Sequence, residues 1–484
     1  MKVKIIFCQI VFAFGVTSLA YGQTNLYSEE VSGRIKNVEN SLMNWAQTPD
    51  TLLRWNIEER MKSHNVKGVS IAVIHNFKIE WAKGYGWADV NEKRKVTPQT
   101  LFQAASISKS ISAIGILKLV EDKKIDIDND INQYLRSWKF PYDSVTKNKK
   151  ITVRNLLNHS SGLNVSGFPG YFSTDSIPTI LQILDGKTPS KTPAVKSVLE
   201  PGLTYQYSGG GICITQLIMT DISNQPFETY MQNSVLKPLG MNESFFIQPP
   251  PLEKKNLLAT AYNKDGSEVP GKYCNYPELA AGGLWTTPTD LAKYIVETQL
   301  SLLGKSSKVL SPEMTKMRLT SFDGYSALGV YIRNNGKYFE FSGGNYGFTS
   351  DYWADMENGD GVIVMTNSAN VEIVSEIINS VASTYHWKDF YKPIIKNIIS
   401  VSDSILNSYV GDYFFGDKKM LVIKKNNKLF IVEDSPWELY FTSQNDFFIS
   451  EFEGDFRFQK NTDGKVTGIL ETKSGRTANR IMEK

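Results

Sequence analysis

A serine and a lysine three residues apart, Ser106 and Lys109, are the pair in this chain best suited to nucleophilic chemistry. They stand before an apolar run, Ile111 to Val120, which predicts a buried central helix. Positions i and i+3 of a helix lie on one face, so the two side chains point the same way. A serine hydroxyl needs a group that removes its proton, and a desolvated lysine can lose its own charge and do so. The helix start also offers free backbone N–H groups that suit a developing oxyanion.

The Ser-x-x-Lys spacing alone is weak evidence, because the chain contains it three times. Ser144 lies in a polar loop and we expect it to be inert. Ser234 stands beside Lys237-Pro238, where a helix is expected to end, which favours a structural role. The competing interpretation of Ser106 is a capping serine followed by a solvated lysine. Only Ser106 combines a helix start with a buried-helix pattern behind it.

Two further side chains have suitable chemistry. Tyr207 lies in a glycine-flanked loop before a second apolar run, Ile212 to Ile222. A phenol whose pKa is lowered by a neighbouring lysine can act as a general base or acid, although a tyrosine here can also simply pack. His159 closes a predicted short helix, and the favoured interpretation is a histidine that contacts the last helical carbonyls rather than a catalytic group.

The elements that position these residues follow from local patterns. The sequence predicts an amphipathic helix over 23–68 and then a hairpin from 69–74 and 79–82. The loop-rich stretch 164–200 is typical of a cleft wall or lid. Thr287 is expected to cap a helix with Asp290 in its first turn. Strands are expected at 327–332, 337–341 and 362–366, with a tight turn within 342–348 and a helix and linker over 371–398.

From about residue 405 the composition changes to short strands separated by hairpin turns at Asn426-Asn427 and Asp463-Gly464. This pattern predicts a small all-β domain, a barrel or sandwich, with no chemistry of its own; the expected strands are 421–423, 429–432, 447–449 and 456–458.

The N-terminus has the features of a secretory signal peptide. Lys2 and Lys4 precede an apolar core from Ile5 to Ala20, and Ala20-Tyr21-Gly22 is a small-x-small cleavage site. The core is short for a membrane span, so cleavage after Gly22 is favoured over an anchor, and no cysteine follows for a lipid. We expect a periplasmic or secreted protein without a stable membrane span.

The composition of the chain limits which classes of molecule it is expected to bind. The chain has 53 basic and 50 acidic residues, a balance that argues against nucleic acid as a partner. Cys8 lies in the signal peptide, and whether Cys213 and Cys274 pair stays open. No metal-ligand spacing is present, so neither a metal nor a cofactor is expected. A small molecule or peptide is the expected partner, and no oligomeric state is predicted.

With these motifs in order, the chain resembles the serine β-lactamase-like hydrolases: class C β-lactamases, D-alanyl-D-alanine carboxypeptidases, D-aminopeptidases and related esterases. The resemblance covers roughly residues 69–368 and rests on Gly84-Tyr85-Gly86, Thr100-Leu101-Phe102 before Ser106, Leu156 to Leu163, Pro201-Gly202 before Tyr207-Ser208, Pro238 to Met241, and Gly282-Gly283-Leu284. It implies an α+β fold, an antiparallel sheet flanked by helices plus a helical subdomain, followed by a lipocalin-like barrel. The expected division is a signal peptide 1–22, a hydrolase domain 23–390, a linker 391–404 and a β domain 405–484.

The resemblance also assigns roles. Ser106 is the acylated nucleophile, Lys109 its partner, and Tyr207 the base that activates Ser106 and later the deacylating water. The oxyanion hole is formed by the backbone N–H groups of Ser106 and Gly344, whose donors stabilise charge that exists only in the tetrahedral states.

Two motifs depart from the family. Gly209 replaces the asparagine that would contact the substrate's amide, and Phe341-Ser342-Gly343 stands where the family has a lysine or histidine first. These changes argue against tight recognition of a β-lactam or a free carboxylate. An esterase or a peptidase of looser specificity remains compatible with the intact Ser106, Lys109 and Tyr207.

The sequence therefore predicts a secreted serine hydrolase that forms an acyl-enzyme with a D-amino-acid peptide, a β-lactam-like compound or a small ester. The alternative is a catalytically silent, penicillin-binding-like sensor or binding protein, which the residues at 209 and 341 motivate. A Ser-His-Asp hydrolase of the α/β class is disfavoured, because the chain has no G-x-S-x-G motif.

Overall fold

A seven-stranded antiparallel sheet organises the larger part of the chain, with strand order β4-β3-β2-β10-β9-β8-β7. The computed structural model describes residues 27–49, 54–415, 418–432, 436–450 and 454–481, so the predicted signal peptide and Cys8 lie outside the described residues. The strands are β2 (Gly68–His75), β3 (Lys78–Asp89), β4 (Arg94–Lys95), β7 (Tyr331–Arg333), β8 (Tyr338–Asn345), β9 (Phe348–Asp355) and β10 (Gly361–Thr366).

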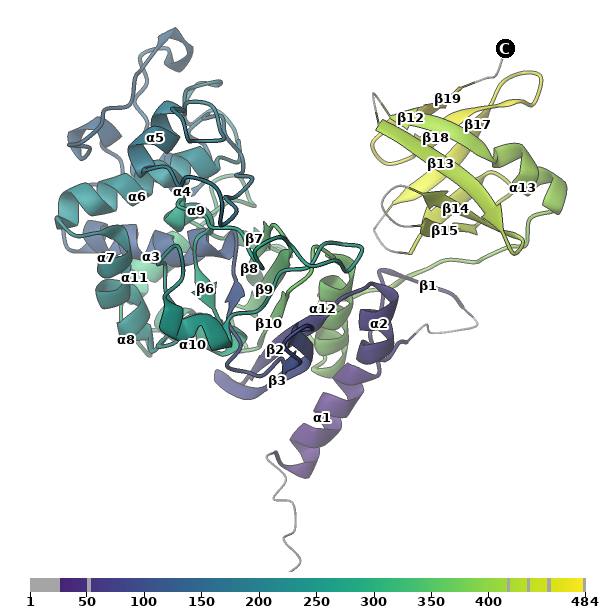
Figure 1. Cartoon of the computed structure of the whole chain (residues 1–484), viewed down its shortest axis with the longest axis horizontal. Helices are drawn as coiled ribbons and strands as arrows, with labels where there is room; N and C mark the ends of the chain where they lie inside the picture. The colour runs from purple at the N-terminus through teal and green to yellow at the C-terminus, as the bar shows by residue number, and fades with distance from the viewer. Residues whose placement is uncertain (1–26, 50–53, 416–417, 433–435, 451–453, 482–484) are drawn as a thin grey trace, which may run out of the picture.

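The centre of the sheet is buried on both faces. Along β2, alternate residues Val69, Ile71 and Val73 enter one apolar core, whereas Ala72 and Ile74 enter the other. Burial on both faces explains why β2 is apolar from Ile71 to Ile74 instead of alternating. The first core is closed by α1 (Glu29–Glu39), α2 (Ile57–Ser63) and α12 (Glu372–Thr384), which gather on one side of the sheet in Figure 1, and the second by α3 (Ile107–Glu121) and α10 (Pro288–Leu302).

The predicted central helix is present as α3, and its residues 107–117 are buried. It packs against α6, α9 and β8, so one end of the sheet meets a helical region at the start of α3. The other helices of this region are α4 (Val153–Leu157), α5 (Ile180–Asp185), α6 (Gly209–Ser223), α7 (Phe227–Met231), α8 (Lys237–Leu239), α9 (Leu279–Gly282) and α11 (Pro312–Arg318). A short two-stranded sheet, β5 (Phe102–Gln103) with β6 (Trp285–Thr286), leads directly into Ser106.

The C-terminal part is a closed eight-stranded barrel preceded by α13 (Asp403–Tyr409). Its strands are β12 (Gly411–Phe415), β13 (Lys418–Lys425), β14 (Lys428–Val432), β15 (Pro436–Phe441), β16 (Asp446–Ile449), β17 (Asp455–Lys460), β18 (Val466–Glu471) and β19 (Thr477–Arg480). Aromatic side chains fill its interior; the rings of Tyr409 and Phe458 stack with centroids 3.9 Å apart. The barrel stands apart from the helical region in Figure 1 and is contacted by Trp45, whose Nε1–H donates to the Ile449 carbonyl.

The predicted fold class, an antiparallel sheet flanked by helices with a helical subdomain and a small all-β barrel, is confirmed.

Several local predictions are wrong. The helix expected over 23–68 is interrupted: α1 and α2 are separated by an extended stretch that contains β1 (Ala46–Gln47), which pairs with β11 (Ile394–Ile395). The strand expected over 327–332 is confined to β7, and β9 was not predicted at all. The tight turn expected within 342–348 is present at Gly347, where φ is +77°, although β8 continues to Asn345 and residues 342–344 therefore lie in a strand.

Candidate active site

The three side chains singled out by motif meet at one oxygen atom. Lys109 Nζ and the Tyr207 hydroxyl each donate a hydrogen bond of 3.0 Å to Ser106 Oγ. Ser106 and Lys109 come from the start of α3, and Tyr207 precedes α6. The arrangement places a potential nucleophile between a cationic donor and a phenol that can exchange its proton.

The backbone before Ser106 makes a sharp turn. Ala105 has φ of +49°, a left-handed conformation that a residue with a Cβ seldom adopts. The Ala104 carbonyl accepts from Ser350 Oγ at 3.0 Å and from the Ile107 amide at 3.1 Å, which anchors the turn. The Ser106 side chain makes no capping hydrogen bond to its helix. The capping-serine interpretation is therefore wrong, and the hydroxyl is free to face Lys109 and Tyr207.

Lys109 is held without an acidic partner. Lys109 is 3 % exposed, and its Nζ donates hydrogen bonds to the Ala281 carbonyl at 2.7 Å and to Ser106 Oγ at 3.0 Å. Within the described ranges, no carboxylate forms an ion pair with it. The Ala281 carbonyl belongs to α9, so the motif around Gly282 serves to position the lysine. Sequence reasoning missed this contact, because a backbone carbonyl leaves no residue-type signal.

Tyr207 is positioned by the cap of α6 and by His159. Ser208 Oγ accepts from the Gly211 amide at 2.9 Å and donates to the Asn164 carbonyl at 2.7 Å. The His159 ring lies 4.5 Å from the Tyr207 ring, and its Nδ1 accepts from the Ser208 amide at 3.3 Å. Burial, helped by the charge of Lys109, lowers the pKa of His159 to about 3, so the imidazole stays neutral at ordinary pH. Its partner is an amide N–H and not a helical carbonyl, contrary to expectation.

Strand β8 runs directly past the nucleophile. A Cβ on Gly343 would lie 2.3 Å from the Ala104 carbonyl oxygen and 2.9 Å from the Ser106 nitrogen, so only glycine fits there. Next to it, a Cβ on Gly344 would meet nothing within 4 Å, and Ser342 and Gly344 are both exposed. Asn345 Nδ2 donates to Gln103 Oε1 at 2.8 Å and fastens the end of the strand to the segment that leads to Ser106.

Phe341 begins an aromatic stack in place of a cation. Its buried ring stacks on Tyr331 with centroids 4.8 Å apart, and Tyr331 stacks on Tyr325 at 4.5 Å. The Arg333 guanidinium lies 4.3 Å from the centroid of Tyr325 and is paired with Glu340. The guanidinium is also 5.8 Å from the centroid of Tyr331, so one aromatic ring separates this positive charge from Phe341.

Gly209 lies against the loop 164–200. A Cβ on Gly209 would be 2.7 Å from Phe168 Cε2 and 3.0 Å from the Ser166 carbonyl oxygen. The side chain that the family carries at this position has no space here, because an aromatic ring occupies it.

An acidic residue that sequence reasoning did not identify, Glu278, precedes α9. It is fully buried, and neither carboxylate oxygen has a hydrogen-bond partner among the described residues. Burial raises its pKa to about 7. Burial, helped by the charge of Glu278, raises the pKa of the Cys213 thiol well above its usual value.

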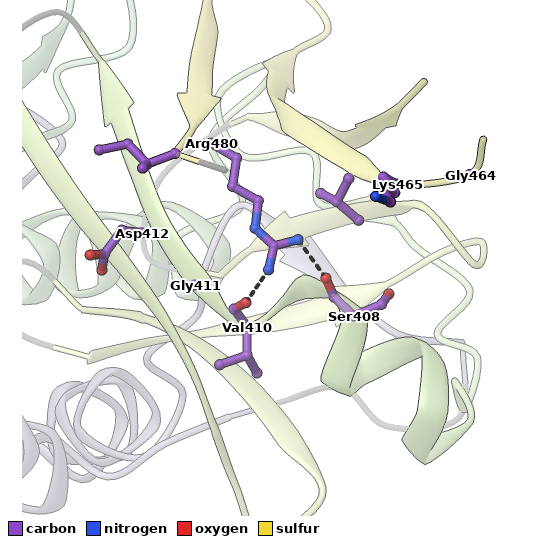
Figure 2. A pocket seen from close by; sticks show the side chains of 9 residues that line it. Ser408, Val410, Gly411, Asp412, Gly464, Lys465 and Arg480 are labelled. Carbon is purple, nitrogen blue, oxygen red and sulfur yellow. Dashed lines mark hydrogen bonds between the residues drawn. The ribbon is translucent and has the colours of Figure 1, made fainter. Parts of the chain in front are cut away.

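The cysteines, the possible metal ligands and the hollow in the barrel offer no comparable chemistry among the described residues. Cys213 and Cys274 are buried and unpaired, and no group of three His, Cys, Asp or Glu side chains among the described residues could hold a metal. A hollow of about 760 Å³ opens at one end of the barrel, but Arg480 there is used to bind the Ser408 and Val410 carbonyls, as Figure 2 shows. No helix within the described ranges is long and apolar enough to cross a membrane.

Comparison with known proteins finds similar sequences and similar structures. Protein flp of Staphylococcus aureus strain MRSA252 is 25% identical over 344 residues, which cover 66% of this chain and 63% of that protein. The teichoic acid D-alanine hydrolase of S. aureus is 25% identical over 299 residues, covering 58% of this chain and 68% of that protein. The structure of the octameric penicillin-binding protein homologue from Pyrococcus abyssi matches with a TM-score of 0.62 at 24% identity, covering 87% of this chain and 98% of its own.

The matches to flp span less than two thirds of that protein's length, and the structural likeness concerns the fold alone. The sequence model described as Beta-lactamase matches residues 53–377, which include the start of α3, the cap of α6 and strand β8. The chain belongs to the beta-lactamase family.

Proposed function

We propose that the protein is an exported serine hydrolase that forms an acyl-enzyme on Ser106 with an ester or amide substrate. The observation that carries this proposal is the pair of 3.0 Å hydrogen bonds that Lys109 Nζ and the Tyr207 hydroxyl make to one serine oxygen. Membership of the beta-lactamase family supports a hydrolytic reaction. A relative from S. aureus is named as a hydrolase, the teichoic acid D-alanine hydrolase.

Before the proposed acylation step, the Tyr207 hydroxyl releases its own proton to solvent and becomes a phenolate. Ser106 Oγ then attacks the substrate carbonyl carbon, and the Ser106 proton passes to the phenolate oxygen. The ammonium of Lys109 lies 5.1 Å from the centroid of the Tyr207 ring and touches the same serine oxygen, so it stabilises negative charge on either group. The backbone N–H groups of Ser106 and Gly344 receive the oxyanion. The C–O or C–N bond then breaks, and the leaving group takes the proton from Tyr207.

Deacylation uses the same groups in reverse order. A water molecule takes the place of the leaving group, gives its proton to Tyr207 and attacks the acyl carbon. The second tetrahedral intermediate collapses, Ser106 Oγ leaves, and Tyr207 returns the proton to it. His159 takes no part as a proton carrier, because its lowered pKa of about 3 keeps it neutral through this cycle.

A silent binding protein is the competing function, and the aromatic groups at Phe341 and beside Gly209 are the observations that favour it. Both functions can bind a ligand beside Ser106, but only the hydrolase needs an activated serine. Steady-state hydrolysis of p-nitrophenyl acetate by the mature protein separates them. Turnover that Ser106→Ala removes supports the hydrolase, and equal rates for the two proteins contradict it.

A further inference from the structure

We propose that Phe168 is a specificity-determining residue, whose ring replaces an amide-recognising side chain and selects neutral esters with an apolar acyl group. The inference rests on the proposed hydrolase function and names the substrate class of that same site.

The first support is steric. Gly209 is the second residue after Tyr207, and a Cβ there would lie 2.7 Å from Phe168 Cε2 and 3.4 Å from Cζ. Real Cβ atoms essentially never approach so closely, so no side chain at 209 can coexist with this ring. The Phe168 ring edge occupies the place where an asparagine at 209 would reach toward the substrate.

The second support is that the ring is fixed in place. The Gly209 amide donates to the Ser166 carbonyl at 3.2 Å and the Gly210 amide donates to the Val165 carbonyl at 3.0 Å. These bonds clamp the segment before Phe168 onto the first turn of α6, and the half-buried ring packs against the main apolar core. Phe168 is therefore part of the wall of the site and not a ring that swings freely.

The third support is position 341 on β8, the strand that runs past Ser106. There, the Phe341 ring stacks on Tyr331, and the Arg333 guanidinium lies beyond Phe341, 5.8 Å from the Tyr331 centroid and 4.3 Å from the Tyr325 centroid. Among the described residues, Lys109 is the one charged side chain that touches Ser106 Oγ. Positions 209 and 341, where the family carries an amide and a cation, thus offer the Phe168 ring and the Phe341 ring, so a substrate group beside the acyl carbon finds neither an amide nor a cation at these two positions. A buried amide or carboxylate would lose its water without gaining a partner, whereas an alkyl group loses nothing.

The test compares three p-nitrophenyl esters whose acyl chains have the same length: pentanoate, N-acetylglycinate and hemiglutarate. They present an alkyl chain, an amide and a carboxylate, and each rate is divided by its uncatalysed hydrolysis rate. For the wild-type protein, we expect kcat/KM for pentanoate to exceed the other two by about tenfold or more, the usual scale for discrimination in an apolar pocket.

Variants locate the preference. Phe168→Ala should shrink the preference for pentanoate over N-acetylglycinate by about tenfold. Gly209→Asn should lower hydrolysis of every ester in the wild-type background, but in the Phe168→Ala background it should favour N-acetylglycinate, because the ring no longer fills the space. Phe172→Ala removes another aromatic side chain of the same loop, one that packs on Tyr346, and should leave the ratios unchanged.

Equal normalised rates for the three esters, or ratios that Phe168→Ala and Phe168→Leu both leave unchanged, would overturn the inference. The leucine variant keeps the test valid if the alanine variant unfolds. In either case, labelling of Ser106 by a fluorophosphonate would show that the hydrolase function still stands. Absence of both turnover and labelling would overturn the hydrolase function as well.

Discussion

The hydroxyl of Tyr207 lies 3.0 Å from the Oγ of Ser106, although 101 positions separate the two residues in the chain. The contact joins the start of α3 to the cap of α6, the two helices that were expected from apolar runs preceded by polar motifs. It gives the site its proton acceptor, and it allows a single-atom test of the mechanism.

Tyr207→Phe removes that oxygen and keeps the ring beside His159. We expect acylation to slow by about 100- to 10,000-fold, the usual contribution of general acid–base catalysis, with little change in thermal stability. Stopped-flow measurement of p-nitrophenol release reports the acylation rate. Tyr205→Phe is the matched control, because the Tyr205 hydroxyl pairs with the Tyr331 hydroxyl at 2.8 Å and does not touch Ser106. A Tyr207→Phe protein as fast as the wild type would exclude Tyr207 as the base.

Lys109→Met replaces a buried cation with an apolar side chain of similar length. A buried charge without an acidic partner costs stability, so we expect an unchanged or higher Tm together with loss of acylation. Differential scanning fluorimetry and ester turnover measure the two effects. Lys118→Met on the same helix removes a partly exposed lysine that pairs with Asp122 and should keep activity. A fall of several degrees in the Tm of Lys109→Met would contradict the view that the lysine is retained for chemistry.

Glu278→Gln should make stability less dependent on pH. Burial raises the folded-state pKa of Glu278 from 4.5 to about 7, so the folded protein holds this proton more tightly than the unfolded chain. The stabilisation that comes from this tighter proton binding is fully present below pH 4.5 and is lost as the pH rises from 4.5 to about 7. The unfolding free energy of the glutamine variant minus that of the wild type should therefore increase by up to about 3 kcal/mol between pH 4.5 and 7. Above about pH 7 this difference should stay constant.

Urea denaturation at several pH values measures this difference. Glu253→Gln, at an exposed position, removes the same kind of charge and should give no such trend. A difference between Glu278→Gln and wild type that stays constant from acidic to neutral pH would show that the carboxyl group has a partner in solution.

Gly343→Ala and Gly344→Ala form a matched pair on β8. The added methyl group at 343 would lie 2.3 Å from the Ala104 carbonyl oxygen, whereas at 344 it would meet nothing within 4 Å. Overpacking of this kind costs about 1–3 kcal/mol, so the first variant should have a lower Tm and the second should not. Equal Tm values for the two variants would mean that β8 does not press against the Ser106 turn as closely as described.

The parts of the site that sequence reasoning found are those encoded locally. Ser106 and Lys109 are three residues apart before a helix, and Tyr207 stands beside a capping serine, so residue type and spacing were sufficient. The buried helix α3 was equally clear, because its apolar residues cover its whole circumference.

The missed features depend on contacts between distant segments. Strand β9 contains Ser350 and Asp351 in its interior, and these polar residues hide the strand pattern; Ser350 is there because its hydroxyl binds the Ala104 carbonyl. Phe168 and Gly209 meet only after the loop folds back onto α6. Glu278 is an unpaired acid in a buried position, where sequence patterns lead one to expect an apolar residue.

The most direct test of the proposed mechanism is the intact mass of the mature protein after exposure to a fluorophosphonate probe, with Ser106→Ala treated in parallel. We expect one adduct on the wild type and none on the variant, because only a serine held by Lys109 and Tyr207 is activated. The absence of an adduct on both proteins, or an equal adduct on both, would contradict an acyl-enzyme on Ser106.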